Sequence, residues 1–151
     1  MDQFEQYCKK IEFEAEVSVF KNPTRTAEEA AVALKCEVNQ IGKSIVFNNL
    51  TTGKPLLIIV AGGLTVDEKK IEEVKGWKIE KMSATDVEKK TGYVIGGVAP
   101  FGHKEKIQSL IDQTLYNYQF VYASAGNVNA VFKVRVGKLA QLAEAEIIDL
   151  R

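Results

Sequence analysis

Two apolar runs near the middle of the chain, at residues 44–48 and 55–60, flank the polar segment Thr51-Thr52-Gly53-Lys54. Short runs rich in β-branched residues on either side of a glycine-containing turn predict a β-hairpin. A hairpin joins two antiparallel neighbours, so a purely parallel sheet built from βαβ units does not accommodate it. This segment therefore predicts a mixed or largely antiparallel sheet.

Further helices and strands follow one another around this hairpin without a strict βαβ rhythm. Helices are predicted by periodicity and by the capping residues Asp2, Thr26, Thr65 and Ser83, at residues 4–11, 27–35, between 65 and 76, 84–90, 113–117 and 139–143. Strands are predicted at residues 13–19, 44–48, 55–60, 78–82, 120–123, 130–136 and 146–150. The expected fold class is α+β, as a single compact domain over residues 1–151 with a central mixed or antiparallel sheet flanked by helices.

Cysteine and histidine are scarce in this sequence, which holds only Cys8, Cys36 and His103. The cysteines form no C-x-x-C pair, so both are expected to be buried thiols rather than a disulfide. So few nitrogen and sulfur ligands argue against a zinc site. A metal site made of carboxylates stays open, although no cluster of ligands in the sequence indicates one.

Charge and hydropathy limit the partners of the chain. It carries 20 basic and 20 acidic residues, whereas proteins that grip long nucleic acids usually carry a basic excess. Extensive contact with DNA or RNA is therefore not expected, but a site that takes only the end of an RNA is compatible. Residues 1–5 do not resemble a secretion signal, and the apolar run at 56–61 is too short to span a membrane. We expect a soluble, cytoplasmic protein.

Residues 91–103 are predicted to form an irregular loop, because they contain Gly92, Gly96, Gly97, Gly102 and Pro100. Glycines permit positive φ and close approach, so such a loop can direct free backbone N–H groups at a carbonyl or phosphate oxygen. The alternative is a wide turn that needs glycine only for its shape. The glycine spacing matches neither a dinucleotide-binding loop nor a Walker loop.

Three further positions are candidates for chemistry or for structure. Lys43 follows the small Gly42 and precedes an apolar strand, so it is either a solvated surface lysine or a cation at the mouth of a pocket. His103 is the only histidine and has no recognisable nucleophile motif beside it, which favours a structural or rim position over a general base. Ser124-Ala125-Gly126 is predicted to be a small-residue turn between two strands.

Five segments, taken together and in order, resemble the YbaK/EbsC and prolyl-tRNA synthetase-associated family of trans-editing deacylases. They are residues 26–31, 40–47, 66–70, 91–103 with a Gly-Gly-x-x-Pro-x-Gly core, and 123–132. The resemblance implies a compact α+β fold with a barrel-like mixed sheet flanked by helices. It also implies hydrolysis of the ester between a small non-cognate amino acid and the terminal adenosine of a tRNA, often tRNA(Pro), without a metal or organic cofactor.

The resemblance also implies which residues form the site. The family's site lysine corresponds to Lys43, and the loop that presents N–H groups to the aminoacyl carbonyl corresponds to Gly96, Gly97 and Pro100. Substrate contacts are implied at Ser44, Ala99, His103, Ser124, Ala125 and Gly126. The implied partners are the acceptor end of an aminoacyl-tRNA and a prolyl-tRNA synthetase, with no membrane and no DNA.

Two departures from the family pattern affect the pocket. Gly42 stands where relatives often carry a larger apolar residue, and Ala99 where many carry Ser or Pro, so no particular amino-acid specificity is transferred. A different class of function stays open beside the enzyme. It is a non-catalytic module that uses the same pocket for a small acyl or nucleotide ligand, or that docks on a synthetase or tRNA.

Overall fold

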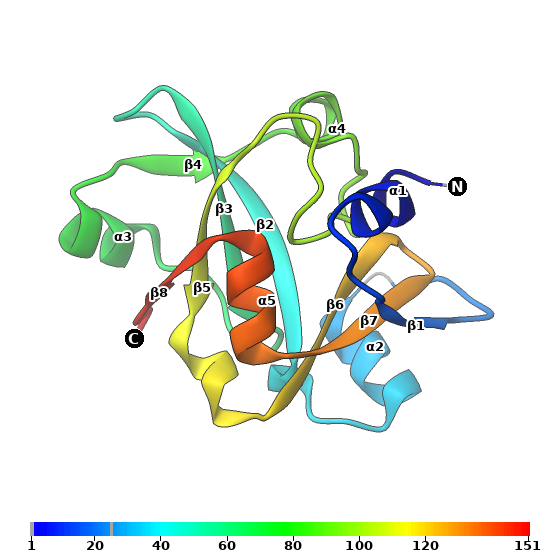
Figure 1. Cartoon of the computed structure of the whole chain (residues 1–151). Helices are drawn as coiled ribbons and strands as arrows, with labels where there is room; N and C mark the ends of the chain where they lie inside the picture. Colours follow the sequence, from blue (N-terminus) through cyan, green and yellow to red (C-terminus); the bar gives the residue numbers. More distant parts are fainter. Residues whose placement is uncertain (1, 25) are drawn as a thin grey trace.

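The computed structural model describes residues 2–24 and 26–151 and contains one sheet of eight strands. The strands are β1 Glu16–Val19, β2 Ile41–Asn49, β3 Lys54–Ala61, β4 Ile79–Lys81, β5 Gln108–Asp112, β6 Phe120–Asn127, β7 Ala130–Arg135 and β8 Ala145–Ile148. Their order is β1-β7-β6-β2-β3-β5-β8, with β4 beside β2 (Figure 1). The pairs β2–β6, β3–β5 and β5–β8 are parallel and the others are antiparallel, so the sheet is mixed as predicted.

Five α-helices and two short 3₁₀ helices flank the sheet within the described residues. They are α1 Gln3–Lys10, α2 Ala27–Leu34, α3 Glu68–Lys75, α4 Ala84–Thr91 and α5 Val136–Ala143, with η1 Val38–Gln40 and η2 Gln113–Asn117. As predicted, Asp2, Thr26 and Ser83 each accept a hydrogen bond from the backbone N–H three residues later. No helix in the described ranges is long and apolar enough to cross a bilayer.

The cap predicted at Thr65 is wrong. Helix α3 is capped by Asp67, whose side chain accepts from the Lys69 N–H at 2.9 Å. A carboxylate at this position also interacts favourably with the helix dipole, so Asp67 is the stronger cap. Thr65 stays outside the helix, where its carbonyl oxygen accepts a hydrogen bond from Arg151.

The predicted hairpin is confirmed, since β2 and β3 pair without interruption from Gly42↔Ala61 to Asn49↔Lys54. Strand β5, in contrast, is missing from the prediction. Residues 109–112 of β5 are all buried in the interior of the sheet, so no alternation of polar and apolar residues marks them as a strand.

The turn predicted at Ser124-Ala125-Gly126 is also wrong, because these residues belong to β6. The chain turns at Val128-Asn129 instead. The pairing of β6 with β7 is irregular between Ser124 and Asn127, and Gly126 adopts a φ of 96°. The small residues therefore form a bulged strand end rather than a loop.

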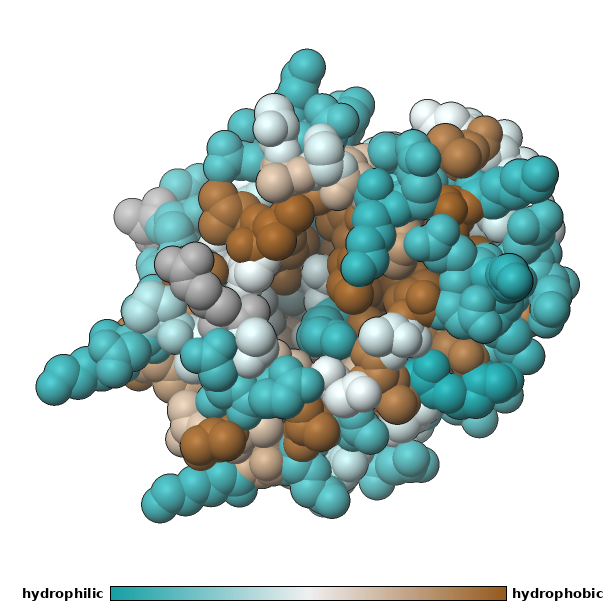
Figure 2. All heavy atoms as spheres, turned by 180° about the vertical axis from the view of Figure 1, so that it is seen from behind, coloured by the Kyte–Doolittle hydropathy of each residue, from teal (hydrophilic) through white to brown (hydrophobic). Residues whose placement is uncertain are grey.

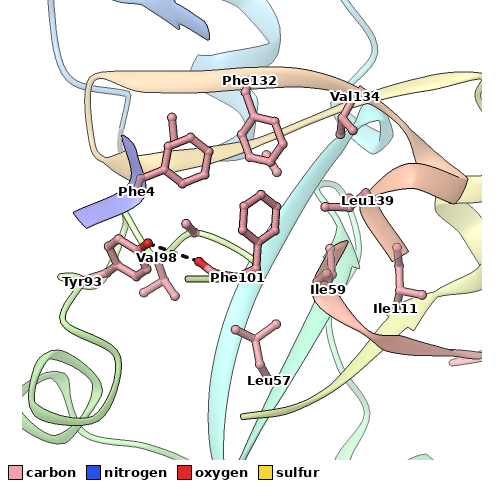
Figure 3. Close-up of a cluster of buried hydrophobic side chains, with 14 of the residues drawn as sticks. Phe4, Leu57, Ile59, Tyr93, Val98, Phe101, Ile111, Phe132, Val134 and Leu139 are labelled. Atoms are coloured by element: carbon pink, nitrogen blue, oxygen red, sulfur yellow. Dashed lines mark hydrogen bonds between the residues drawn. The ribbon is translucent and has the colours of Figure 1, made fainter. Parts of the chain in front are cut away.

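Strand β3 separates the two larger of the three hydrophobic clusters in the described chain, because both of its faces are buried. Alternate residues face one cluster (Leu57, Ile59, Ala61) and the other (Leu56, Ile58, Val60). The first cluster contains Phe4, Phe101 and Phe132, whose ring centroids lie 5.1–5.6 Å apart (Figure 3). The Tyr93 hydroxyl donates to the Phe101 carbonyl at 3.2 Å and so ties the glycine-rich loop to this cluster (Figure 3).

Both cysteines are free thiols, as predicted. Cys8 is buried in the first cluster, whereas Cys36 is only half-buried.

The sheet has one short joint, between the parallel strands β2 and β6. They pair only at Ile41↔Tyr122 and Gly42↔Ala123 and then diverge (Figure 1). Gly42 leaves room for a side chain of β3 at this joint, because a Cβ there would stand 3.1 Å from the Ile59 Cγ2. Strand β2 gains a neighbour on this side again only where β4 pairs with its residues 47–49. Within the described chain, residues 43–46 therefore have one strand edge without a strand neighbour.

Candidate functional site

The gap between the diverging strands β2 and β6 holds a cavity of about 520 Å³. Its wall consists of the start of α2 with Thr24 and Thr26, residues 41–46 of β2, Lys81, Met82 and Val87, the loop residues Ile95, Gly96 and Val98, and parts of the β6–β7 hairpin. Figure 2 shows a hollow on the face opposite to that of Figure 1, bordered by hydrophobic and hydrophilic residues. The volume falls within the range of about 300–1,000 Å³ that is typical of small-molecule sites.

The free edge of β2 brings backbone polar groups to this cavity. The Val46 carbonyl accepts from the Met82 N–H at 3.1 Å, on the side away from β3. Because backbone groups alternate in direction along an antiparallel strand, the N–H and C=O of Ser44 point to the same side. That side lacks a strand neighbour at Ser44, and the Ser44 hydroxyl oxygen is buried with no hydrogen-bond partner among the described residues. Ser44 thus offers unpaired polar groups at the cavity wall.

Lys43 lines the cavity rather than standing in solvent. Its Nζ donates to the Leu64 carbonyl oxygen at 2.9 Å. Burial lowers the pKa of Lys43, the Glu28 carboxylate on α2 opposes that shift, and the Lys81 ammonium adds to it. The site therefore holds a partly desolvated cation in a fixed position.

The glycine-rich loop meets the cavity through a turn at 94–97. The Gly97 N–H donates to the Val94 carbonyl at 2.9 Å, and Gly96 has a φ of 90°, which the third position of a type II turn requires. Gly96 and Val98 line the cavity, and neither backbone N–H donates a hydrogen bond within the described part of the chain. The Gly97 N–H is already used inside the turn, so in this structure it is not free to bind a substrate carbonyl.

Four of the ten predicted site residues share this cavity: Lys43, Ser44, Gly96 and Ser124. Pro100 and His103 line a second cavity of about 290 Å³ instead. The remaining four, Gly97, Ala99, Ala125 and Gly126, are absent from both walls as the described residues define them. Ala99 and Ala125 are buried in the core, and a Cβ on Gly126 would stand 2.9 Å from the Tyr93 ring.

His103 contacts other residues of the glycine-rich loop, Ala99 and Tyr93. Its Nε2–H donates to the Ala99 carbonyl at 2.8 Å, and its ring meets the Tyr93 ring edge-on. Burial lowers the pKa of His103, against the opposing effect of the Ala99 hydrogen bond. A neutral imidazole that fixes the glycine-rich loop explains this position better than a substrate contact.

Several wall residues were not predicted from the sequence. Lys81 and Met82 reach the cavity because β4 pairs with the far end of β2, and Val87 follows them on α4. Glu28 and Asn127 complete the polar wall. The order of strands in the sheet brings these residues together, so a local sequence pattern does not reveal them.

Among residues 2–24 and 26–151, no three His, Cys, Asp or Glu side chains gather as they do around a metal ion.

A sheet that parts around a cavity lined by a lysine and a glycine-rich loop agrees with the family match. The profile described as "Aminoacyl-tRNA editing domain" matches residues 21–142. The chain therefore belongs to the aminoacyl-tRNA editing domain family, as the sequence resemblance implies.

Two individual relatives have names that refer to tRNA deacylation or to tRNA aminoacylation. The chain is 31% identical over 102 residues to EbsC of Enterococcus faecalis, which is named as a candidate Cys-tRNA(Pro)/Cys-tRNA(Cys) deacylase; the match covers 67% of this chain and 62% of EbsC. It is 37% identical over 112 residues to a proline–tRNA ligase of Limosilactobacillus fermentum, covering 71% of this chain and 20% of the ligase.

A solved structure matches the whole fold. It is the crystal structure of a candidate trans-editing enzyme for prolyl tRNA synthetase, with a TM-score of 0.90 and 31% sequence identity. The match covers 100% of this chain and 98% of that chain. The α+β fold with a mixed sheet flanked by helices is thereby confirmed. At the level of the family, the function is aminoacyl-tRNA editing by deacylation.

Proposed function

We propose that this chain is a trans-editing hydrolase, which removes a small non-cognate amino acid from tRNA(Pro) by cleaving the ester to the terminal adenosine. One observation carries the proposal. The Lys43 ammonium, the N–H groups of Gly96 and Val98, which donate no hydrogen bond among the described residues, and the free edge of β2 at Ser44 all border one cavity.

The size and charge of the cavity fit the end of a tRNA rather than its body. A volume of about 520 Å³ accommodates a ligand of small-molecule size, such as an amino acid with part of its nucleotide. The chain has no net charge, so its grip on the phosphate backbone is local. Lys43 and Lys81 are the cations in the described cavity wall, and Glu28 is the anion.

Oxyanion stabilisation supplies most of the proposed catalysis. An aminoacyl ester is already reactive, so hydrolysis needs no strong protein nucleophile. When water attacks, the new C–O bond places negative charge on the carbonyl oxygen, and a fixed N–H donor there is worth about 3–4 kcal/mol. The N–H groups of Gly96 and Val98 are the candidates in this chain, since that of Gly97 is bonded to Val94.

The remaining steps move one proton and break one bond. The ester C–O bond breaks, the amino acid leaves as its carboxylic acid, and the ribose oxygen takes up a proton. As in the family that the sequence resembles, we assign activation of the water to the neighbouring ribose hydroxyl of the tRNA. Lys43 contacts the nucleotide end of the substrate, where a fixed cation neutralises phosphate or ribose oxygens.

A prolyl-tRNA synthetase is the proposed protein partner. The proline–tRNA ligase of Limosilactobacillus fermentum supports this partner. The segment that matches this chain is part of the ligase itself, so that the two are joined in one polypeptide there. A separate chain would act in trans, on tRNA that the synthetase has released.

A panel of mischarged tRNAs tests the function. Purified protein is mixed with tRNA(Pro) carrying alanine, cysteine, serine or proline and with a non-proline tRNA carrying alanine, and loss of the acyl group is followed in single turnover. We expect rapid deacylation of at least one non-cognate tRNA(Pro) and none of Pro-tRNA(Pro). Saturable binding of these tRNAs with no release of amino acid would instead establish the non-catalytic module.

A further inference from the structure

The site lysine, Lys43, donates a hydrogen bond to the loop that follows β3. A second cation, Arg151, donates to the same loop from another part of the chain. Residues 61–65 leave the end of β3, and two consecutive carbonyls in this loop accept from different cations. The Leu64 carbonyl accepts from the Lys43 Nζ at 2.9 Å, and the Thr65 carbonyl accepts from the Arg151 Nη1 at 3.3 Å. The position of Lys43 is therefore coupled to the position of this loop.

A buried carboxylate fixes the other side of the loop. The Asp112 side chain is 1% exposed, and its Oδ2 accepts from the Ala61 N–H at 3.0 Å and from the Arg151 Nη2 at 2.7 Å. A backbone hydrogen bond from the Leu64 N–H to the Ala61 carbonyl at 2.9 Å closes the loop on itself. Asp112 thus holds the start of the loop directly and holds its end through Arg151.

We propose that Asp112 and Arg151 are positioning residues for Lys43, acting through the Leu64 carbonyl. Neither residue lines the cavity as the described residues define it, so neither is a catalytic residue. The inference rests on the proposed function only in taking Lys43 as the site lysine. Without the pair, the loop keeps its sequence and turn but loses the contacts that hold the Leu64 carbonyl opposite the ammonium.

The groups around Lys43 determine whether loss of the Leu64 contact raises or lowers the pKa of Lys43. Glu28 faces it from α2, Lys81 faces it from β4, and the Leu64 carbonyl is its hydrogen-bond acceptor. A hydrogen bond to the charged form of a group favours that form. Loss of the carbonyl therefore leaves a partly buried ammonium with a weaker acceptor, and its pKa falls.

The experiment measures Lys43 itself and does not require hydrolysis. The side-chain NMR signal of Lys43, identified by its absence in Lys43→Arg, is titrated with pH in the wild-type chain, Arg151→Ala, Arg151→Lys and Lys75→Ala. The last is a matched control, because Lys75 forms an ion pair with Glu146 and, in the described part of the chain, no hydrogen bond to the loop at 61–65. Deacylation of the best substrate of the tRNA panel is measured on the same proteins.

We expect the pKa of Lys43 to fall by about one unit in Arg151→Ala, to recover most of that fall in Arg151→Lys, and to stay unchanged in Lys75→Ala. The deacylation rate should fall with it, through kcat more than KM. An unchanged or raised Lys43 pKa in a folded Arg151→Ala protein would overturn the inference and leave the pair purely structural. If no tRNA in the panel is hydrolysed, the proposed function fails while the titration still decides the positioning role.

Discussion

Gly97 lies directly against the backbone of Asn127, so that a Cβ on Gly97 would stand 2.8 Å from the Asn127 Cα. Its φ is not positive, in contrast to the φ of 90° at Gly96. Gly97 is therefore required for close packing between the glycine-rich loop and the end of β6, and Gly96 is required for the turn. The two glycines should respond differently to the same substitution.

Gly97→Ala should push the loop away from β6 and lower the free energy of unfolding by about 1–3 kcal/mol, because backbone atoms cannot yield to the new methyl group. The chemical rate of the folded protein should fall more than its affinity for tRNA, since Gly96 and Val98 move with the loop. Thermal unfolding and single-turnover kinetics measure the two effects. Gly96→Ala is the matched control: its Cβ would stand 3.5 Å from Val128, so strain alone should cost about 1 kcal/mol. Equal rates in all three folded proteins would reduce the loop to a structural turn.

Lys43→Ala should fold with nearly wild-type stability and lose about 100-fold or more in single-turnover deacylation, because truncating one partner of a partly buried, charged contact costs about 2–5 kcal/mol. The folding expectation follows from its surroundings, because the Lys43 ammonium donates to one carbonyl and forms no close ion pair with any residue that the structure describes. Circular dichroism checks the fold, and quenched-flow assays follow the acyl group. Wild-type rates in a folded Lys43→Ala protein would remove Lys43 from the mechanism.

Affinity for tRNA should depend weakly on salt. Few phosphates are contacted if the cations concerned are local lysines such as Lys43, Lys104 or Lys106, and Lys106 already pairs with Glu144 at 2.8 Å. Each contacted phosphate adds about −0.7 to −0.9 to the slope of log K against log salt concentration. Filter binding from low to moderate salt measures the slope. A slope steeper than about −5 would reveal an extensive basic surface.

Stability should fall in alkaline solution through Cys8. Burial raises the pKa of Cys8 from 9.0 to about 11, with the nearby Asp2 and Glu5 adding to the rise. Between these two values the unfolded chain releases the thiol proton while the folded chain retains it, so the free energy of unfolding falls as pH rises. The fall amounts to about 2–3 kcal/mol when the folded thiol titrates as well. Denaturant titrations of wild type and Cys8→Ala from pH 8 to 11 isolate this contribution, and parallel curves would contradict it.

Much of the fold follows from local patterns, but the position of β5 and the end of β6 do not. The hairpin of β2 and β3 is marked by a glycine turn between apolar runs, and three helix caps are marked by side chains that bond the first turn. Residues 109–112 show no alternation because both faces of that strand are covered. Ser124-Ala125-Gly126 has the composition of a turn, but the ring of Tyr93 and the Phe4 side chain leave no room for a Cβ at Gly126.

The candidate site, like the fold, was predicted from the sequence only in part. Four residues implied by the family resemblance border one cavity: Lys43 and Ser44 come from β2, Ser124 from β6 and Gly96 from the glycine-rich loop. Pro100 and His103, which the resemblance also implies, line the second cavity instead, because a turn at 94–97 separates the part of the loop that faces the first cavity from the part that faces α1 and α5. The direction in which a loop points depends on tertiary contacts such as that of His103 with Ala99, which no spacing encodes.

The two-pair joint between β2 and β6 has a consequence for how such a protein can diversify. Residues beyond the joint, including Ser44, Ile45 and Asn127, border the cavity on edges where no ladder must be maintained between β2 and β6. Each half of the sheet is held by its own neighbours, so a substitution at these edges changes the shape of the cavity without breaking a strand pairing between the halves. Single substitutions at these edges can therefore change which ligand the cavity accepts while the strand pairing within each half of the sheet is kept.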